Sequence, residues 1–107
     1  MTMPTTIWKF TDVPIEDCPR IRMTAKLVRW LHVELSDDYT TLTLWAEVRP
    51  FGTRSEQKSS TPHVHVRGTG HPLTGYEGTH VGTVIDHRSE LVWHVFADDV
   101  DIEAGVR

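Results

Sequence analysis

Residues 25–49 read AKLVRWLHVELSDDYTTLTLWAEVR, and this stretch decides the fold. Its second half, Thr40–Arg49, alternates between polar and apolar residues, and the apolar ones on one face are Leu42, Leu44, Ala46 and Val48. A period of two residues is typical of a half-buried strand. The first half, Ala25–Leu35, fits either a strand or the period of a helix. We favour the strand, because it gives Thr40–Arg49 a partner.

A loop at Ser36–Tyr39 would join these two strands as a hairpin. Leu35 would then lie opposite Thr40, and the aliphatic side chains would pair on one face as Val33–Leu42, Leu31–Leu44 and Leu27–Val48. A slip of one residue would turn these groups outward, so matching of the faces fixes the register. The same register places Trp30 beside Trp45 on the other face, either as a second core layer or as an exposed aromatic patch.

Four further runs rich in Val, Thr, Ile or Trp predict strands: Thr6–Phe10, Pro62–Arg67, Thr79–Ile85 and Leu91–Phe96. Apolar residues on both faces of the last run indicate a central strand. Residues 12–22, which are rich in proline, predict an irregular connection. The pattern therefore predicts an all-β fold of about six mostly antiparallel strands, in a small sandwich or a curled, barrel-like sheet.

The last two runs form a second predicted hairpin around a turn at Asp86–Ser89. Its register stays open. A five-residue loop puts His94 opposite Gly82 and places His80 on the same face as His94. A four-residue loop instead puts Trp93 opposite Gly82, which would make room for the indole ring.

Composition limits the class of protein. The chain has 107 residues, of which 38% are hydrophobic, which predicts a single domain with its core at about residues 6–97. We expect an exposed loop at 50–62 and a frayed acidic tail at 98–107. A formal net charge of −4 argues against general nucleic-acid binding. No apolar run is long enough to span a membrane, and one cysteine excludes an internal disulfide. With no signal-peptide pattern at the N-terminus, these features predict a soluble protein of a reducing compartment.

Histidine is the compositional oddity, with seven in the chain. On a strand, His63 and His65 would share a face about 7 Å apart. Two imidazoles at that spacing could bind zinc or iron, with a third ligand from His71, His80 or His94. The pair resembles the strand motif of the cupin family, but no carboxylate follows it. Arg67 would add positive charge to the same face, so we expect no metal cofactor and a solvated strand face instead.

Other catalytic patterns are missing from the sequence. The segment Gly68–Gly78 contains four glycines and a proline, which specifies a shaped turn more readily than a phosphate loop leading into a helix. There is no Gly-X-Ser-X-Gly motif. Cys18 lacks a cluster of basic neighbours that would activate a thiol. The sequence therefore does not favour an enzyme.

Two blocks of sequence are familiar. Gly68–Pro72 reads GTGHP and Val92–Phe96 reads VWHVF, and shorter matches occur at Ile7–Phe10 and Leu44–Pro50. Together they resemble a family of small uncharacterised proteins encoded by tailed bacteriophages and prophages. The resemblance implies the cytoplasm of a bacterial host and carries no activity with it. It also marks His71, Trp93 and His94 as family features.

These observations predict a non-catalytic phage accessory protein that binds a host or phage protein, with self-association as a further option. The candidate contact residues are Trp30, Trp45, Arg67 and His71. Three alternatives stay open: a virion decoration or tail accessory protein, a histidine-liganded metalloprotein, and a protein that binds a small anionic, nucleotide-like ligand at the Gly68–Gly78 loop.

Overall fold

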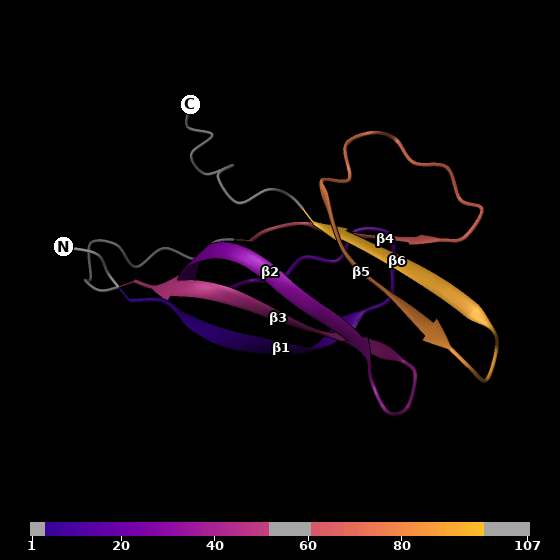
Figure 1. Ribbon diagram of the computed structural model, residues 1–107, viewed down its shortest axis with the longest axis horizontal. Coiled ribbons are helices and arrows are strands. Elements are labelled where there is room, and N and C mark those ends of the chain that lie inside the picture. Colours follow the sequence, from indigo (N-terminus) through magenta and orange to yellow (C-terminus); the bar gives the residue numbers. More distant parts are fainter. Residues whose placement is uncertain (1–3, 52–60, 98–107) are drawn as a thin grey trace.

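The computed structural model describes residues 4–51 and 61–97, which form six strands in two antiparallel sheets of three strands each (Figure 1). The strands are β1 (Thr6–Pro14), β2 (Ala25–Leu35), β3 (Thr41–Pro50), β4 (Val64–Gly68), β5 (Thr79–Asp86) and β6 (Leu91–Ala97). The first sheet has the order β1-β3-β2 and the second β4-β6-β5. The predicted all-β, antiparallel fold is confirmed, and β6 is central in its sheet as expected.

Two predictions about loops fall wholly or mostly outside the described residues. These are the tail at 98–107 and the loop at 50–62, of which 52–60 is not described. Within the two described ranges, no helix has the length and apolarity to cross a membrane.

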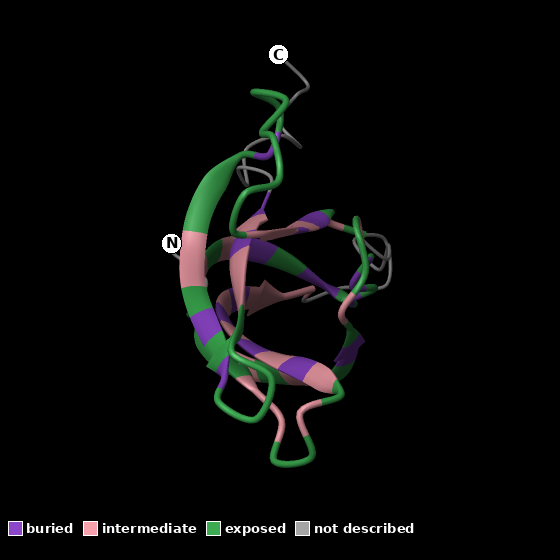
Figure 2. Cartoon of the chain, turned by 90° about the vertical axis from the view of Figure 1, so that its right-hand side faces the viewer, coloured by how far each residue is buried: buried purple, intermediate pink, exposed green. Residues whose placement is uncertain are grey.

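The core lies between the two sheets. Leu42, Leu44, Ala46 and Val48 are all 0% exposed, so the predicted aliphatic face of β3 is confirmed. Buried residues of the second sheet and of the β1–β2 connection also belong to this core: Val64, Val66, Val84, Val95, Ala97, Ile21 and Met23. Figure 2 looks along the long axis and shows both sheets curving around this common interior, with buried and exposed residues alternating along the strands. The strand period of two therefore sets the two faces.

β1 is longer than the sequence predicts, because it continues to Pro14. Residues 12–14 were expected to belong to an irregular connection. A bulge between Phe10 and Val13 includes Asp12 at φ 60°, and the strand then resumes with Val13 opposite Leu42. The bulge keeps the apolar face turned inward on both sides of the irregularity.

The register of the first hairpin differs from the prediction near its loop. Leu35 lies opposite Leu42 rather than Thr40, and the Ser36 amide donates to the carbonyl of Thr41 at 2.9 Å. Leu27 lies opposite Val48, as predicted. Two bulges in β2 reconcile these two ends of the hairpin, since each adds one unpaired residue. No particular residue type is required at such bulges, so the sequence pattern did not predict them or the register that they produce.

The bulges place Trp30 and Trp45 on opposite faces of the first sheet, so the predicted pairing of these residues is wrong. Trp30 lies opposite Ala46 on the inner face, where its ring contacts Phe10 at a centroid distance of 6.0 Å. Trp45 lies opposite His32 on the outer face, with ring centroids 5.3 Å apart. The two indoles therefore form no common aromatic patch.

The second hairpin adopts neither of the two registers considered. Asp86 lies opposite Leu91 and Gly82 opposite Val95. A bulge between His80 and Gly82 then puts His80 opposite Phe96, on the same face as His94. Gly82 makes room for the other sheet and not for Trp93, because a Cβ atom at Gly82 would lie 2.8 Å from Cγ1 of Val33.

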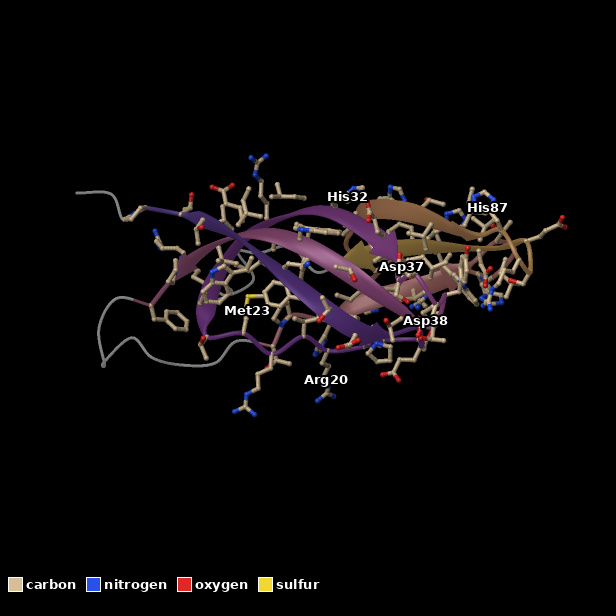
Figure 3. The ribbon with its side chains drawn as sticks, turned by 90° about the horizontal axis from the view of Figure 1, so that it is seen from below. Arg20, Met23, His32, Asp37, Asp38 and His87 are labelled. Carbon is tan, nitrogen blue, oxygen red and sulfur yellow. The ribbon has the colours of Figure 1, made fainter. Side chains whose placement is uncertain are left out.

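Two further contacts tie the halves of the chain together. The outer edge of β4 is covered by the β1–β2 connection, where the amides of Val64 and Val66 donate to the carbonyls of Pro19 (3.0 Å) and Asp17 (3.2 Å). At the hairpin ends, the guanidinium of Arg88 lies 4.2 Å from the ring centroid of Tyr39. Figure 3 shows Asp37 and Asp38 of one hairpin loop at the same end of the molecule as His87 of the other.

Candidate functional site

The segment from Thr69 to Gly78, called here the β4–β5 loop, projects beyond the second sheet (Figure 1). Every residue of this loop except Glu77 is exposed, and Glu77 is only 4% exposed. Its carboxylate accepts hydrogen bonds from the Thr74 amide (2.8 Å), the Thr74 hydroxyl (3.0 Å) and the Gly75 amide (2.9 Å). The loop is thus built around one buried carboxylate, which satisfies backbone donors inside the loop.

These bonds lower the pKa of Glu77 from 4.5 to about 2. The Thr74 amide is the largest cause, burial acts against it, and the Gly75 amide and Thr74 hydroxyl add to the lowering. The carboxylate is therefore ionised at neutral pH, where its hydrogen bonds are charge-assisted.

Arg67 fastens the loop to the rest of the fold. Its Nε donates to Glu77 at 3.2 Å, and its Nη1 donates to the carbonyl and the carboxylate of Asp17, both at 3.0 Å. The Arg67 side chain is only 11% exposed. The structure thus places this candidate contact residue beneath the loop, as an anchor between the loop, β4 and the β1–β2 connection.

Two histidines of the GTGHP and VWHVF blocks, His71 and His94, form hydrogen bonds where the loop leaves β4. Nδ1 of His71 accepts a hydrogen bond from the Gly68 amide at 3.1 Å, and Nε2 of His94 lies 2.8 Å from the Thr69 hydroxyl. A Cβ atom at Gly68 would lie 3.1 Å from the His71 ring and 3.3 Å from the Trp93 ring. The GTGHP and VWHVF blocks therefore contact each other and form the shaped turn that the sequence predicts.

The loop presents two large side chains to solvent. Leu73 is 58% exposed and Tyr76 is 86% exposed. The Tyr76 amide donates to the Thr74 hydroxyl at 3.1 Å, which holds the backbone next to its side chain. Gly75 between them has φ +96°, a conformation that other residues rarely adopt. The arrangement can bind another molecule without first ordering the loop.

The remaining histidines of the second sheet lie on its outer face. The Thr83 hydroxyl lies 3.1 Å from Nδ1 of His94 and 3.1 Å from Nε2 of His80, whose ring contacts Phe96 at 5.2 Å. His65 lies opposite Phe96 on the same face, while His63 forms a bridge with Arg20. In the part of the chain that the structure describes, no three His, Cys, Asp or Glu side chains are grouped so as to hold a metal ion. The Thr83 hydroxyl thus connects the imidazoles of His80 and His94.

Sequence reasoning missed Glu77, although a signal for it exists. Thr74 and Glu77 have the spacing Thr-X-X-Glu, in which a glutamate side chain bonds back to the amide of the threonine. This spacing is typical of the first turn of a helix, whereas Gly75 and Gly78 do not favour a helix in this segment. The bond from the Thr74 amide forms here without a helix.

The profile of a protein family described as a domain of unknown function (DUF7352) matches residues 3–105. The chain belongs to this family. No curated protein and no solved structure matches the chain. The DUF7352 match includes all six strands and the β4–β5 loop, so the site lies within the family's own domain. The family description states no activity.

Proposed function

We propose that this DUF7352 domain is a binding protein that docks onto a protein partner through the β4–β5 loop. The observation that carries the proposal is the pair Leu73 and Tyr76, exposed on a loop that the buried Glu77 holds in place. Single exposed apolar residues are ordinary on protein surfaces. Here two of them lie on one loop, and hydrogen bonds within the loop hold the backbone between them.

The energetics favour such a contact. Tyrosine is enriched among the residues that dominate binding energy, because it buries a large area with few rotatable bonds. The hydrogen bonds from Thr74 and Gly75 to Glu77 have already ordered the loop, so association would not have to supply that ordering. Functional loops on a rigid sheet scaffold follow the same principle.

The chemistry of the loop also describes the partner. His71 is the only titratable side chain of the loop besides Tyr76 and the buried Glu77, so the tip carries no fixed exposed charge. The complementary surface is therefore an apolar pocket for Leu73 and the Tyr76 ring, with an acceptor for the Tyr76 hydroxyl. Binding should depend weakly on salt, because few charges are involved.

The resemblance to phage and prophage proteins supports a partner inside an infected bacterium, either a host protein or another phage protein. We propose a host protein, and a non-catalytic role in which occupancy of the partner's surface is the effect. Detection of the chain in purified virions would instead favour a virion component as partner.

Affinity capture from infected cells tests the proposal when it is repeated with matched variants. The immobilised protein should retain one partner in stoichiometric amount, and Tyr76→Ser and Leu73→Ser should each weaken its binding at least tenfold. Leu91→Ser is the control, since Leu91 is also a largely exposed leucine (49%) but belongs to the second hairpin and not to the loop. Equal thermal stability of all variants would show that they fold alike. A partner retained equally by Tyr76→Ser, or no stoichiometric partner at all, would refute the proposal.

A further inference from the structure

A second candidate site lies on the outer face of the first sheet, which is turned away from the second sheet. A shallow depression of about 470 Å³ is lined there by Thr5, Thr6, Ile7, Arg29, Leu31 and Glu47. Its volume lies within the range of small-molecule sites, which is roughly 300–1,000 Å³. No part of it belongs to the β4–β5 loop, so it is independent of the function proposed above.

The bulges of β2 shape this depression. Arg29 lies opposite Glu47 and His32 opposite Trp45, and Leu31 is the extra residue of the bulge between Trp30 and His32. Bulges redirect side chains in this way. Leu31 remains 36% exposed, and Ile7, opposite Glu47 on the other side of β3, is 61% exposed. The depression therefore has an apolar side chain on each flank and a carboxylate between them.

The polar groups at the floor leave donors available for a ligand. Glu47 accepts from Nε of Arg29 at 2.8 Å with one oxygen and from the Thr5 hydroxyl at 2.7 Å with the other. Both carboxylate oxygens are thus engaged, whereas the ion pair uses only Nε of Arg29. Because the Arg29 side chain is 69% exposed, its two terminal nitrogens can still form the paired hydrogen bonds that a guanidinium makes with a carboxylate.

The outer face of the first sheet is basic, although the chain as a whole carries −4. Strand register places four cationic side chains on this face, namely Lys9, Lys26, Arg29 and Arg49, against the two carboxylates of Glu34 and Glu47. A local excess of positive charge raises the concentration of anions near the surface. Charge on this face therefore complements an anionic ligand.

We propose that the depression binds a small monocarboxylate with an apolar chain. The carboxylate pairs with the terminal nitrogens of Arg29, and the chain lies between Ile7 and Leu31. A compact inorganic anion would use the arginine but not the two apolar flanks, so those flanks specify the rest of the ligand. The Glu47 carboxylate already accepts hydrogen bonds from Arg29 and from the Thr5 hydroxyl, which partly offset its negative charge.

Octanoate is the probe, and an NMR titration of the ¹⁵N-labelled protein is the measurement. Shift changes should concentrate at residues 5–7, 29–31 and 47. Octanamide, which has the same chain without the charge, should bind at least tenfold more weakly. Arg29→Gln should weaken octanoate binding at least tenfold. Arg88→Gln is the matched control, because Arg88 is also largely exposed but lies in the β5–β6 loop, and it should leave the affinity unchanged.

The apolar flanks have their own test. In the wild-type protein, affinity should rise from butanoate to octanoate, and Ile7→Ser should flatten that dependence while leaving butanoate binding nearly unchanged. The inference is wrong if octanamide binds as well as octanoate, if Arg29→Gln has no effect, or if phosphate binds as tightly as octanoate. Tyr76→Ser should not alter octanoate binding, so failure of the loop proposal and failure of this one are distinguishable.

Discussion

Replacing Gly82 by alanine probes the packing between the two sheets. A Cβ atom at this position would lie 2.8 Å from Cγ1 of Val33, whereas carbon atoms in contact ordinarily lie about 3.5–4.0 Å apart. Val33 is only 4% exposed, and its branched Cβ restricts it to few rotamers, so its methyl group cannot swing aside. The added methyl group must therefore push β5 and β2 apart or distort one of them.

The size of the effect follows from two opposing contributions. Overpacking of a well-packed core costs about 1–3 kcal/mol. Alanine also restricts the unfolded chain, which returns about 0.4–1 kcal/mol. We therefore expect Gly82→Ala to lower the free energy of unfolding by up to about 2.6 kcal/mol. In a Val33→Ala background the obstructing methyl groups are gone, so the same change at Gly82 should be neutral or stabilising.

Urea unfolding of the wild type, both single variants and the double variant measures this coupling as a double-mutant cycle. The loss of unfolding free energy in the double variant should be smaller than the sum of the losses in the two single variants, by about 1–3 kcal/mol. Equal losses from Gly82→Ala in both backgrounds would show that the alanine and Val33 do not collide. Ile85→Ala, at an exposed position of β5, is the control for a change in the strand itself.

Three further outcomes follow from individual contacts. The pKa of Glu77 is about 2 in the folded protein against 4.5 ordinarily, so its ionised form stabilises the fold above about pH 4.5. This contribution disappears as the pH falls through 2, and thermal unfolding of Glu77→Gln should show lower stability at pH 7 and a shallower loss toward acid than the wild type. Arg88→Gln removes the contact with the Tyr39 ring and should lower the free energy of unfolding by less than about 1 kcal/mol in urea titrations. The indole N–H of Trp30 has no hydrogen-bond partner among the described residues. Because an unpaired buried donor costs about 1–3 kcal/mol, Trp30→Phe should lose little stability despite the smaller ring, and a loss above about 3 kcal/mol would mean that the donor is bonded.

The alternation of Thr40–Arg49 was enough to predict the inner face of β3, because successive side chains of a strand must point to opposite sides. The bulges were not predictable in the same way. Apolar residues on both sides of Leu27–His32 hide an extra residue from the pattern. The register near the loop and the separation of Trp30 from Trp45 both depend on those bulges, and both predictions failed for that reason.

The candidate sites likewise combine features that the sequence predicts with features that it does not predict. Glycine and proline in Gly68–Gly78 predicted a shaped turn, since those residues restrict or extend the backbone locally. The anchoring of that turn through Arg67 to Asp17 joins residues fifty positions apart and has no local signature. The depression around Arg29 likewise requires Ile7 and Glu47 from two other strands. Local patterns predict local shape, whereas sites assembled across strands depend on register.

The first three strands of the chain form one sheet and the last three form the other, and this order has a consequence for folding during synthesis. During synthesis, the first three strands emerge from the ribosome before any of the second sheet exists. They can pair with one another, but the hydrophobic inner face of their sheet stays exposed to solvent until residues 64–97 are synthesised and cover it. A chain stalled or cleaved near residue 60 would therefore be prone to aggregation, and its exposed apolar face would make it a target for chaperones and proteases.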